Sequence, residues 1–206
     1  MLLFIIECLT TNGGLFIIKV NKQRGGFIMN IWHDISPKRI TSEKFYAVIE
    51  ISKGGKNKYE LDKETGMLKL DRVLFTSTHY PANYGFIPRT FADDGDPLDV
   101  LVLCSETIQP MTLVECKPIG VLNMIDNDSC DEKIIAVPVN DPNYCGYNDI
   151  TDLPRHYFDE IQHFFQVYKS LESGKVTSVT ETNGVEMAKE IIKKSIDSYI
   201  KDFQMA

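Results

Sequence analysis

Short apolar runs separated by turn residues dominate the chain between Phe45 and Val139. They predict strands at 45–51, 58–61, 68–73, 98–103, 113–125 and 133–139. Gly-Gly, Thr-Gly, Asp-Gly and Asn-Asp-Ser sequences stand between several of these runs, and such residues favour tight turns. Regular short strands with this punctuation are typical of a small β-barrel.

The C-terminal part of the chain changes to a helical period. Apolar side chains recur at helical spacing over 157–168, after a start at Asp152-Leu-Pro, and again over 185–203. Asn183 and Glu186 have the spacing of a capping box before the second segment. The sequence contains no internal repeat and no interdomain linker. We therefore predict an α+β fold, mainly β, in which helices pack outside a barrel.

Three carboxylates precede one of the predicted strands. Asp94, Asp96 and Asp99 lie within six residues, directly before the apolar run 100–103. A divalent cation such as Mg²⁺, Mn²⁺ or Ca²⁺ would relieve the repulsion between them. Gly95 permits a sharp turn, although the spacing is not that of an EF-hand loop. The alternative is an acidic surface turn without a metal.

Length and composition restrict the class of protein. The 206 residues are most simply one domain, and 43% hydrophobic and 25% charged residues are ordinary for a globular protein. The net charge of −7 argues against nucleic acid or an anionic membrane as the main partner. Five scattered cysteines without a CxxC pair indicate reduced thiols, and we expect a cytoplasmic protein.

Residues 1–28 differ from the rest because they are apolar and glycine-rich. The purine-rich codons possible for Arg24-Gly-Gly resemble a ribosome-binding site a short distance before Met29. Our hypothesis is that residues 1–28 are a translated leader outside the fold and that 29–206 form a single domain. The alternative is an additional β-hairpin with its turn at Asn12-Gly-Gly.

Other polar residues have patterns that allow either a functional or a structural interpretation. Asp126 and Asp131 flank a second turn, which by itself is well explained as a solvated loop. Lys58 and Glu60 share one face of a predicted strand. Lys169 ends the first predicted helix, where a lysine also complements the helix dipole.

Taken together and in order, these blocks resemble the soluble, family I inorganic pyrophosphatases from about Glu50 to Lys169. The matching blocks are Ile49-Glu50-Ile51, Lys58-Tyr59-Glu60, Asp71-Arg72, Tyr80-Pro-x-Asn-Tyr84-Gly85, Asp94-Gly-Asp-Pro-x-Asp99-Val-Leu, Asp126 with Asp131 and Lys133, and Tyr168-Lys169. The resemblance implies an OB-like five-stranded barrel with flanking helices. It also implies Mg²⁺-dependent hydrolysis of inorganic pyrophosphate, bound as its Mg complex, to two orthophosphates. The related short, bacterial-type subunits usually assemble into hexamers.

The resemblance also implies roles for individual residues. Several Mg²⁺ ions would be bound by Asp94, Asp96, Asp99, Asp126 and Asp131, with Glu60 reaching an ion through water. Asp96 would be the general base for a metal-bridged water. Phosphate oxygens would be held by Lys58, Arg72, Tyr84, Lys133, Tyr168 and Lys169. Glu50 and Tyr80 would support this network.

The sequence differs from the family pattern at one position, and three other functions are alternatives to this interpretation. Val167 stands where related bacterial enzymes often carry a second histidine besides His163, which leaves the stability of a hexamer open. A non-catalytic metal-binding module is one alternative, but it has no use for Lys58, Arg72 and Lys169. An OB-type nucleic-acid binder should be basic, whereas this chain is acidic. A phosphatase for organic phosphates would differ only in the size of its pocket.

Overall fold

The computed structural model describes residues 7–9, 15–17, 30–126, 129–173 and 177–203. Its strands are β1 (Glu7–Leu9), β2 (Leu15–Ile17), β3 (Phe45–Ile51), β4 (Asn57–Leu61), β5 (Leu68–Val73), β6 (Asn83–Phe86), β7 (Asp99–Val102), β8 (Leu113–Asp126), β9 (Ser129–Pro138) and β10 (Thr177–Gly184). Its helices are η1 (Pro37–Arg39), η2 (Ile150–Asp152), α1 (His156–Val167) and α2 (Val185–Phe203).

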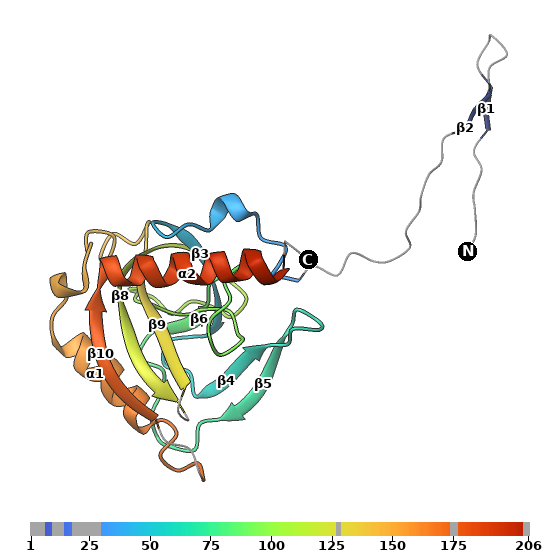
Figure 1. The fold of residues 1–206 in the computed structure, drawn as a ribbon. Coiled ribbons are helices and arrows are strands. Elements are labelled where there is room, and N and C mark those ends of the chain that lie inside the picture. Colours follow the sequence, from blue (N-terminus) through green and yellow to red (C-terminus); the bar gives the residue numbers. More distant parts are fainter. Residues whose placement is uncertain (1–6, 10–14, 18–29, 127–128, 174–176, 204–206) are drawn as a thin grey trace.

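Five strands close into the predicted barrel. Strands β8, β3, β6, β7 and β9 are hydrogen-bonded in that order, and β9 pairs with β8 again. The long strand β8 makes this closure possible, because its residues 113–116 pair with β3 and its residues 116–126 pair with β9. Strand β10 extends the sheet along 120–126 of β8, and β4 and β5 form a separate hairpin (Figure 1). The OB-like barrel predicted from the sequence is confirmed.

All the predicted strands are present, but the sequence patterns did not reveal two others. Strand β6 lies in the segment that we interpreted only as an aromatic, turn-rich motif, and it has just four residues, NYGF. Gly85 is needed there, since a Cβ at this position would lie 1.8 Å from the carbonyl oxygen of Val48 on β3. Strand β10, TSVTETNG, has little apolar character because it lies at the edge of the sheet.

The barrel strands are buried on both faces. On β7, Val100 belongs to a cluster with Ile192 of α2, whereas the next residue, Leu101, belongs to a cluster with Phe165 of α1. Successive side chains of a strand point to opposite faces, so the two faces of β7 pack into two different apolar clusters. This double burial explains why the strands read as nearly continuous apolar runs.

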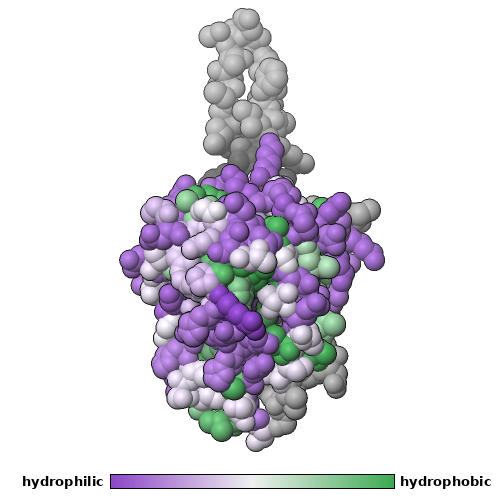
Figure 2. All heavy atoms as spheres, turned by 90° about the vertical axis from the view of Figure 1, so that its left-hand side faces the viewer, coloured by the Kyte–Doolittle hydropathy of each residue, from purple (hydrophilic) through white to green (hydrophobic). Residues whose placement is uncertain are grey.

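Both helices occur where the helical period predicted them. The predicted capping box is wrong, because Asn183 lies in β10 opposite Val121. The first helical N–H of α2, on Val185, instead donates to Oδ2 of Asp149 at 2.9 Å. In the described ranges no helix is both long and apolar enough to span a membrane. On the face seen in Figure 2, hydrophilic side chains predominate and hydrophobic ones form separate patches.

Near the N-terminus, β1 and β2 form an antiparallel pair in which Glu7 lies opposite Ile17. The backbone of these residues thus has the pairing that the alternative hairpin interpretation requires. The proposed turn at Asn12 lies outside the described residues. Our hypothesis that residues 1–28 are a translated leader remains a prediction.

Candidate active site

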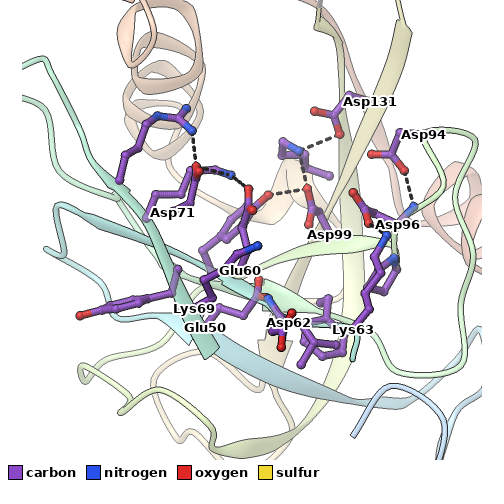
Figure 3. A pocket seen from close by; sticks show the side chains of 18 of the residues that line it. Glu50, Glu60, Asp62, Lys63, Lys69, Asp71, Asp94, Asp96, Asp99 and Asp131 are labelled. Carbon is purple, nitrogen blue, oxygen red and sulfur yellow. Dashed lines mark hydrogen bonds and ion pairs between the residues drawn. The ribbon is translucent and has the colours of Figure 1, made fainter. Parts of the chain in front are cut away.

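A cleft of about 790 Å³ lies between the β4–β5 hairpin and the barrel strands β6, β7 and β9 (Figure 3). Most of the predicted site residues line it, namely Glu50, Lys58, Glu60, Arg72, Tyr84, Asp94, Asp96, Asp99, Asp131, Lys133, Tyr168 and Lys169. Tyr80 is not part of the lining, and the side chain of Asp126 lies outside the described residues. The fold therefore brings together groups that are far apart in the sequence.

On the barrel side of the cleft, a buried lysine joins two carboxylates. Strands β7 and β9 are parallel with Asp99 opposite Lys133, and Asp131 is on the same face of β9 as Lys133. Nζ of Lys133 donates to Asp99 at 2.6 Å and to Asp131 at 2.7 Å, and the Tyr84 hydroxyl also donates to Asp99. Burial alone would lower the pKa of Lys133, but the two carboxylates hold that pKa well above its usual value.

The loop before β7 presents the other acids of the signature. Asp94 accepts a hydrogen bond from the N–H of Asp96 at 3.0 Å, and the N–H of Ala92 donates to the carbonyl of Asp96 at 2.8 Å. Gly95 has a φ of 84°, in the left-handed region that favours glycine. Burial, followed by the nearby charge of Asp99, raises the pKa of Asp94. A cation placed here would offset this cost of ionisation.

The proposed base, Asp96, has a lysine partner that the sequence analysis did not identify. Lys63, in the turn of the β4–β5 hairpin, reaches across to form an ion pair with Asp96 (Figure 3). Its Nζ also donates to the carbonyl of Gly95 at 3.1 Å and lies 5.6 Å from the centre of the Trp32 ring. Both charged side chains are about half exposed, so this pair is accessible to solvent and ligands.

The hairpin side of the cleft carries a second set of charged groups. Lys58 on β4 lies opposite Arg72 on β5 in the strand register. Lys58 forms an ion pair with Glu60 and lies 3.5 Å from Asp71, which also pairs with Arg72. Burial would raise the pKa of Asp71, but Lys58 and Arg72 outweigh it and lower that pKa. The positive side chains of Lys58 and Arg72 thus share the carboxylate of Asp71, and Lys58 also pairs with Glu60.

Glu50 lies deep between the two sides. It is 6% exposed, and its Oε1 accepts a hydrogen bond from the N–H of Leu61 on β4 at 2.8 Å. Burial, followed by the charge of Asp99, raises the pKa of Glu50 to about 8. This carboxyl group is therefore largely protonated at neutral pH in the metal-free protein.

Tyr168 and Lys169 come from the turn that follows α1. Tyr168 is buried and packs on Phe164 with a ring separation of 5.2 Å, and the Nζ of Lys169 lies 5.2 Å from the Tyr168 ring. Tyr80 is 2% exposed and lies 5.2 Å from the Tyr84 ring. Tyr80 therefore contacts a residue of the cleft without lining the cleft itself.

The donor set suits hard divalent cations, since carboxylate oxygens are the ligands that Mg²⁺ and Ca²⁺ prefer. Within the described part of the chain, no three His, Cys, Asp or Glu side chains already converge tightly enough to hold an ion. Ammonium groups occupy the neutralising positions instead, with Lys133 between Asp99 and Asp131 and Lys63 against Asp96. Metal binding at these acids thus requires a rearrangement of side chains.

The structure adds residues to which the sequence analysis assigned no role. Asp71 was part of a matching block and lines the cleft beside Arg72. Lys63 belongs to a predicted turn, and Glu172 follows α1 and contacts Arg72 at 2.8 Å. The position of Asp71 next to Arg72 in the sequence could have indicated its role, whereas no spacing in the chain indicates the tertiary contacts of Lys63 and Glu172.

Carboxylates that face lysines and an arginine in one cleft are the groups needed to hydrolyse a phosphoric anhydride, and the fold and site together define a hydrolase of that class. The profile of a family described as inorganic pyrophosphatase matches residues 47–200. The chain therefore belongs to the soluble, family I inorganic pyrophosphatases, which are metalloenzymes that hydrolyse inorganic pyrophosphate to two orthophosphates.

Individual relatives support this assignment. The chain is 48% identical to soluble inorganic pyrophosphatase 2 of Chlamydomonas reinhardtii over 168 residues, which cover 82% of this chain and 87% of that protein. It is 47% identical to the inorganic pyrophosphatase of Aquifex pyrophilus over 172 residues, covering 82% and 97%. The solved inorganic pyrophosphatase of Thermus thermophilus has a TM-score of 0.77 and 41% identity, covering 83% of this chain and 99% of that chain.

Proposed function

We propose that this cleft hydrolyses pyrophosphate in a Mg²⁺-dependent reaction in which Asp96 is the general base. The arrangement that carries the proposal is the Asp99–Lys133–Asp131 bridge on one side of the cleft, with Lys58 and Arg72 on the other. The acids suit metal ions, and the cations suit the oxygens of a highly charged anion. A site that only stored metal would have no need for the second set.

The magnesium sites in this proposal are formed by Asp94, Asp96, Asp99, Asp126 and Asp131, with Glu60 acting through a water molecule. When bound, the ions would neutralise substrate charge and lower the pKa of a bound water, which would supply a nucleophile near neutral pH. A metal ion at these carboxylates would take over from Lys133 the neutralisation of Asp99 and Asp131. The ammonium group of Lys133 is then available for a phosphate oxygen.

The chain's own groups carry the remaining work. Asp96 accepts the proton of the attacking water, for which it must exchange its contact with Lys63. Phosphate oxygens are bound by Lys58, Arg72, Tyr84, Lys133, Tyr168 and Lys169. Lysines supply point charges, whereas the arginine supplies a planar fork of donors. These contacts orient the substrate and stabilise the charge on the departing phosphate.

The test is phosphate release from pyrophosphate by the purified protein, with and without Mg²⁺, for the wild type, Asp96→Asn and Asp93→Asn. Asp93 is a matched control because it lies in the same loop but pairs with Lys194 at 2.7 Å, away from the cleft. We expect Mg²⁺-dependent release by the wild type and Asp93→Asn. Asp96→Asn should bind Mg²⁺ and substrate yet lose roughly 10²-fold or more in turnover. Near-normal turnover of Asp96→Asn would reject its role as the base.

We further propose a homo-oligomer, with a hexamer favoured by the family resemblance. Apolar side chains on and after β5 support self-association, since Leu70 is 52% exposed and Phe75 is 61% exposed. Val167 in place of a histidine should change the pH dependence of any assembly to which α1 contributes. Light scattering across pH and protein concentration measures this directly, and a monomer at micromolar concentration would contradict the proposal.

Finally, we propose that residues 29–206 form the single pyrophosphatase domain of a cytoplasmic protein. Cys104, Cys116, Cys130 and Cys145 are all free thiols, which supports a reducing compartment. A variant that begins at Met29 should retain the full kcat and thermal stability. A loss of either would show that residues 1–28 contribute to the fold. Mass spectrometry of the protein from the native host identifies its first translated residue. Detection of a peptide spanning residues 15–35 would reject the leader hypothesis.

A further inference from the structure

Glu172 is a buried carboxylate outside the lining of the cleft. It lies in the segment after α1, with its side chain 6% exposed, and its Oε1 accepts a hydrogen bond from Nε of Arg72 at 2.8 Å. Its own N–H donates to the carbonyl of Lys169 at 2.8 Å. This residue therefore links the hairpin that carries Arg72 to the turn that carries Lys169.

The contacts of Arg72 leave one part of its guanidinium group unused. Nε is bound by Glu172 and Nη1 by Asp71, so two carboxylates hold the planar group from different directions. Nη2 is buried and has no hydrogen-bond partner among the described residues. A buried donor without a partner is unfavourable, because it has given up its hydrogen bonds to water. Arg72 lines the cleft, where a bound anion would supply oxygen acceptors for a donor of this kind.

We propose that Glu172 is a positioning residue: it orients Arg72 so that Nη2 is presented to a phosphate oxygen of the substrate. The proposal rests on the proposed role of Arg72 in binding pyrophosphate. Glu172 does not contact the substrate in this account, and it acts through the guanidinium group of Arg72. Arginine has several rotatable bonds, so without this anchor Arg72 would lose rotamer freedom on binding substrate, at a cost in affinity.

The experiment is a double-mutant cycle with Glu172→Gln, Arg72→Lys and the double variant, in which KM and kcat are measured at saturating Mg²⁺. Glu160→Gln on α1 is the control, because its carboxylate is exposed and pairs with His156 of the same helix at 3.5 Å. We expect Glu172→Gln to raise KM about tenfold with a smaller change in kcat. In the Arg72→Lys background the same substitution should change KM less than twofold, and Glu160→Gln should change nothing.

A purely structural role for Glu172 predicts a different result. It would lower the unfolding temperature of Glu172→Gln and leave KM unchanged, and that outcome overturns the proposal. An equal KM effect in both backgrounds overturns it too, since Glu172 would then not act through Arg72. If Arg72→Lys itself has a normal KM, the role of Arg72 in substrate binding fails, and the proposal fails with it.

A second variant keeps the test decisive if Glu172→Gln does not fold. Glu172→Asp preserves the buried charge but withdraws the carboxylate by one methylene group from Nε of Arg72. We expect it to fold, to raise KM severalfold and to leave the binding of Mg²⁺ alone, measured by calorimetry, at the wild-type level. A folded Glu172→Asp enzyme with the wild-type KM would overturn the proposal.

Discussion

The barrel side and the hairpin side of the cleft both hold lysines against carboxylates, but in different environments. Lys133 on β9 is 3% exposed in its side chain and has carboxylate partners from β7 and β9. Lys58 on β4 is 18% exposed, and Lys63 in the hairpin turn is 50% exposed. Strand β7 is hydrogen-bonded on both edges, whereas β4 and β5 pair only with each other among the described strands.

This difference shows how the enzyme divides its site between a fixed part and an adjustable part. The closed barrel sets the spacing of Asp99 and Asp131 through strand register, which a substrate cannot change. The hairpin is tied to the rest of the cleft through side chains, with Lys63 on Asp96 and Arg72 on Glu172. Charge changes on the barrel side should therefore affect stability, and those on the hairpin side should mainly affect binding.

The largest expected effect is that of Lys133→Met on stability. Removing the ammonium group leaves Asp99 and Asp131 close together without their shared cation, and we expect the metal-free protein to lose about 3 kcal/mol of unfolding free energy. Added Mg²⁺ should restore part of this loss, because it neutralises the same carboxylates. Urea unfolding with and without Mg²⁺ measures both effects. If Lys133→Met has the same urea midpoint as the wild type without Mg²⁺, charge changes on the barrel side do not affect stability more than those on the hairpin side.

A smaller effect concerns the pH dependence introduced by Glu50. Its pKa is raised from 4.5 to about 8 in the folded state, so between these values the folded protein holds a proton that the unfolded chain releases. Stability from this group is fully present below pH 4.5 and is lost progressively as the pH rises toward 8.

Glu50→Gln should abolish that contribution, since an amide does not titrate in this range and can still accept the hydrogen bond from Leu61. The measurement is the unfolding free energy of both proteins between pH 5.5 and 8 with a chelator present. The wild type should lose stability relative to the variant as the pH rises. Parallel curves would mean that Glu50 has an ordinary pKa in the folded protein.

The smallest expected effect on stability is that of Lys58→Met. Lys58 pairs with Glu60 and Asp71 at the edge of the hairpin, and we expect a change in unfolding free energy of less than about 1 kcal/mol. Its KM for pyrophosphate should nevertheless rise, because a phosphate contact is lost. If Lys58→Met instead destabilises the protein as much as Lys133→Met, the hairpin is as much a part of the stable core as the barrel wall.

Local patterns were enough to predict most of the fold. Apolar runs and turn residues placed β3 and β5 at their observed bounds, and the helical period located α1 and α2. Strands β6 and β10 were missed because neither has an apolar pattern of its own. The first depends on the close approach of Gly85 to Val48, and the second on pairing with β8. In both cases a tertiary contact overrides weak local propensity.

By itself the sequence determined which chemical groups are available and, through the order of its blocks, the family to which they belong. The acids of the 94–99 loop, the cations of β4 and β5 and the lysine after α1 were identified without coordinates. Only the tertiary structure decided which of them meet: Lys133 between two carboxylates, Lys63 on Asp96, and Glu172 on Arg72. The physical reason is that ion pairing and burial depend on distances across the cleft, and one-dimensional spacing does not specify those distances.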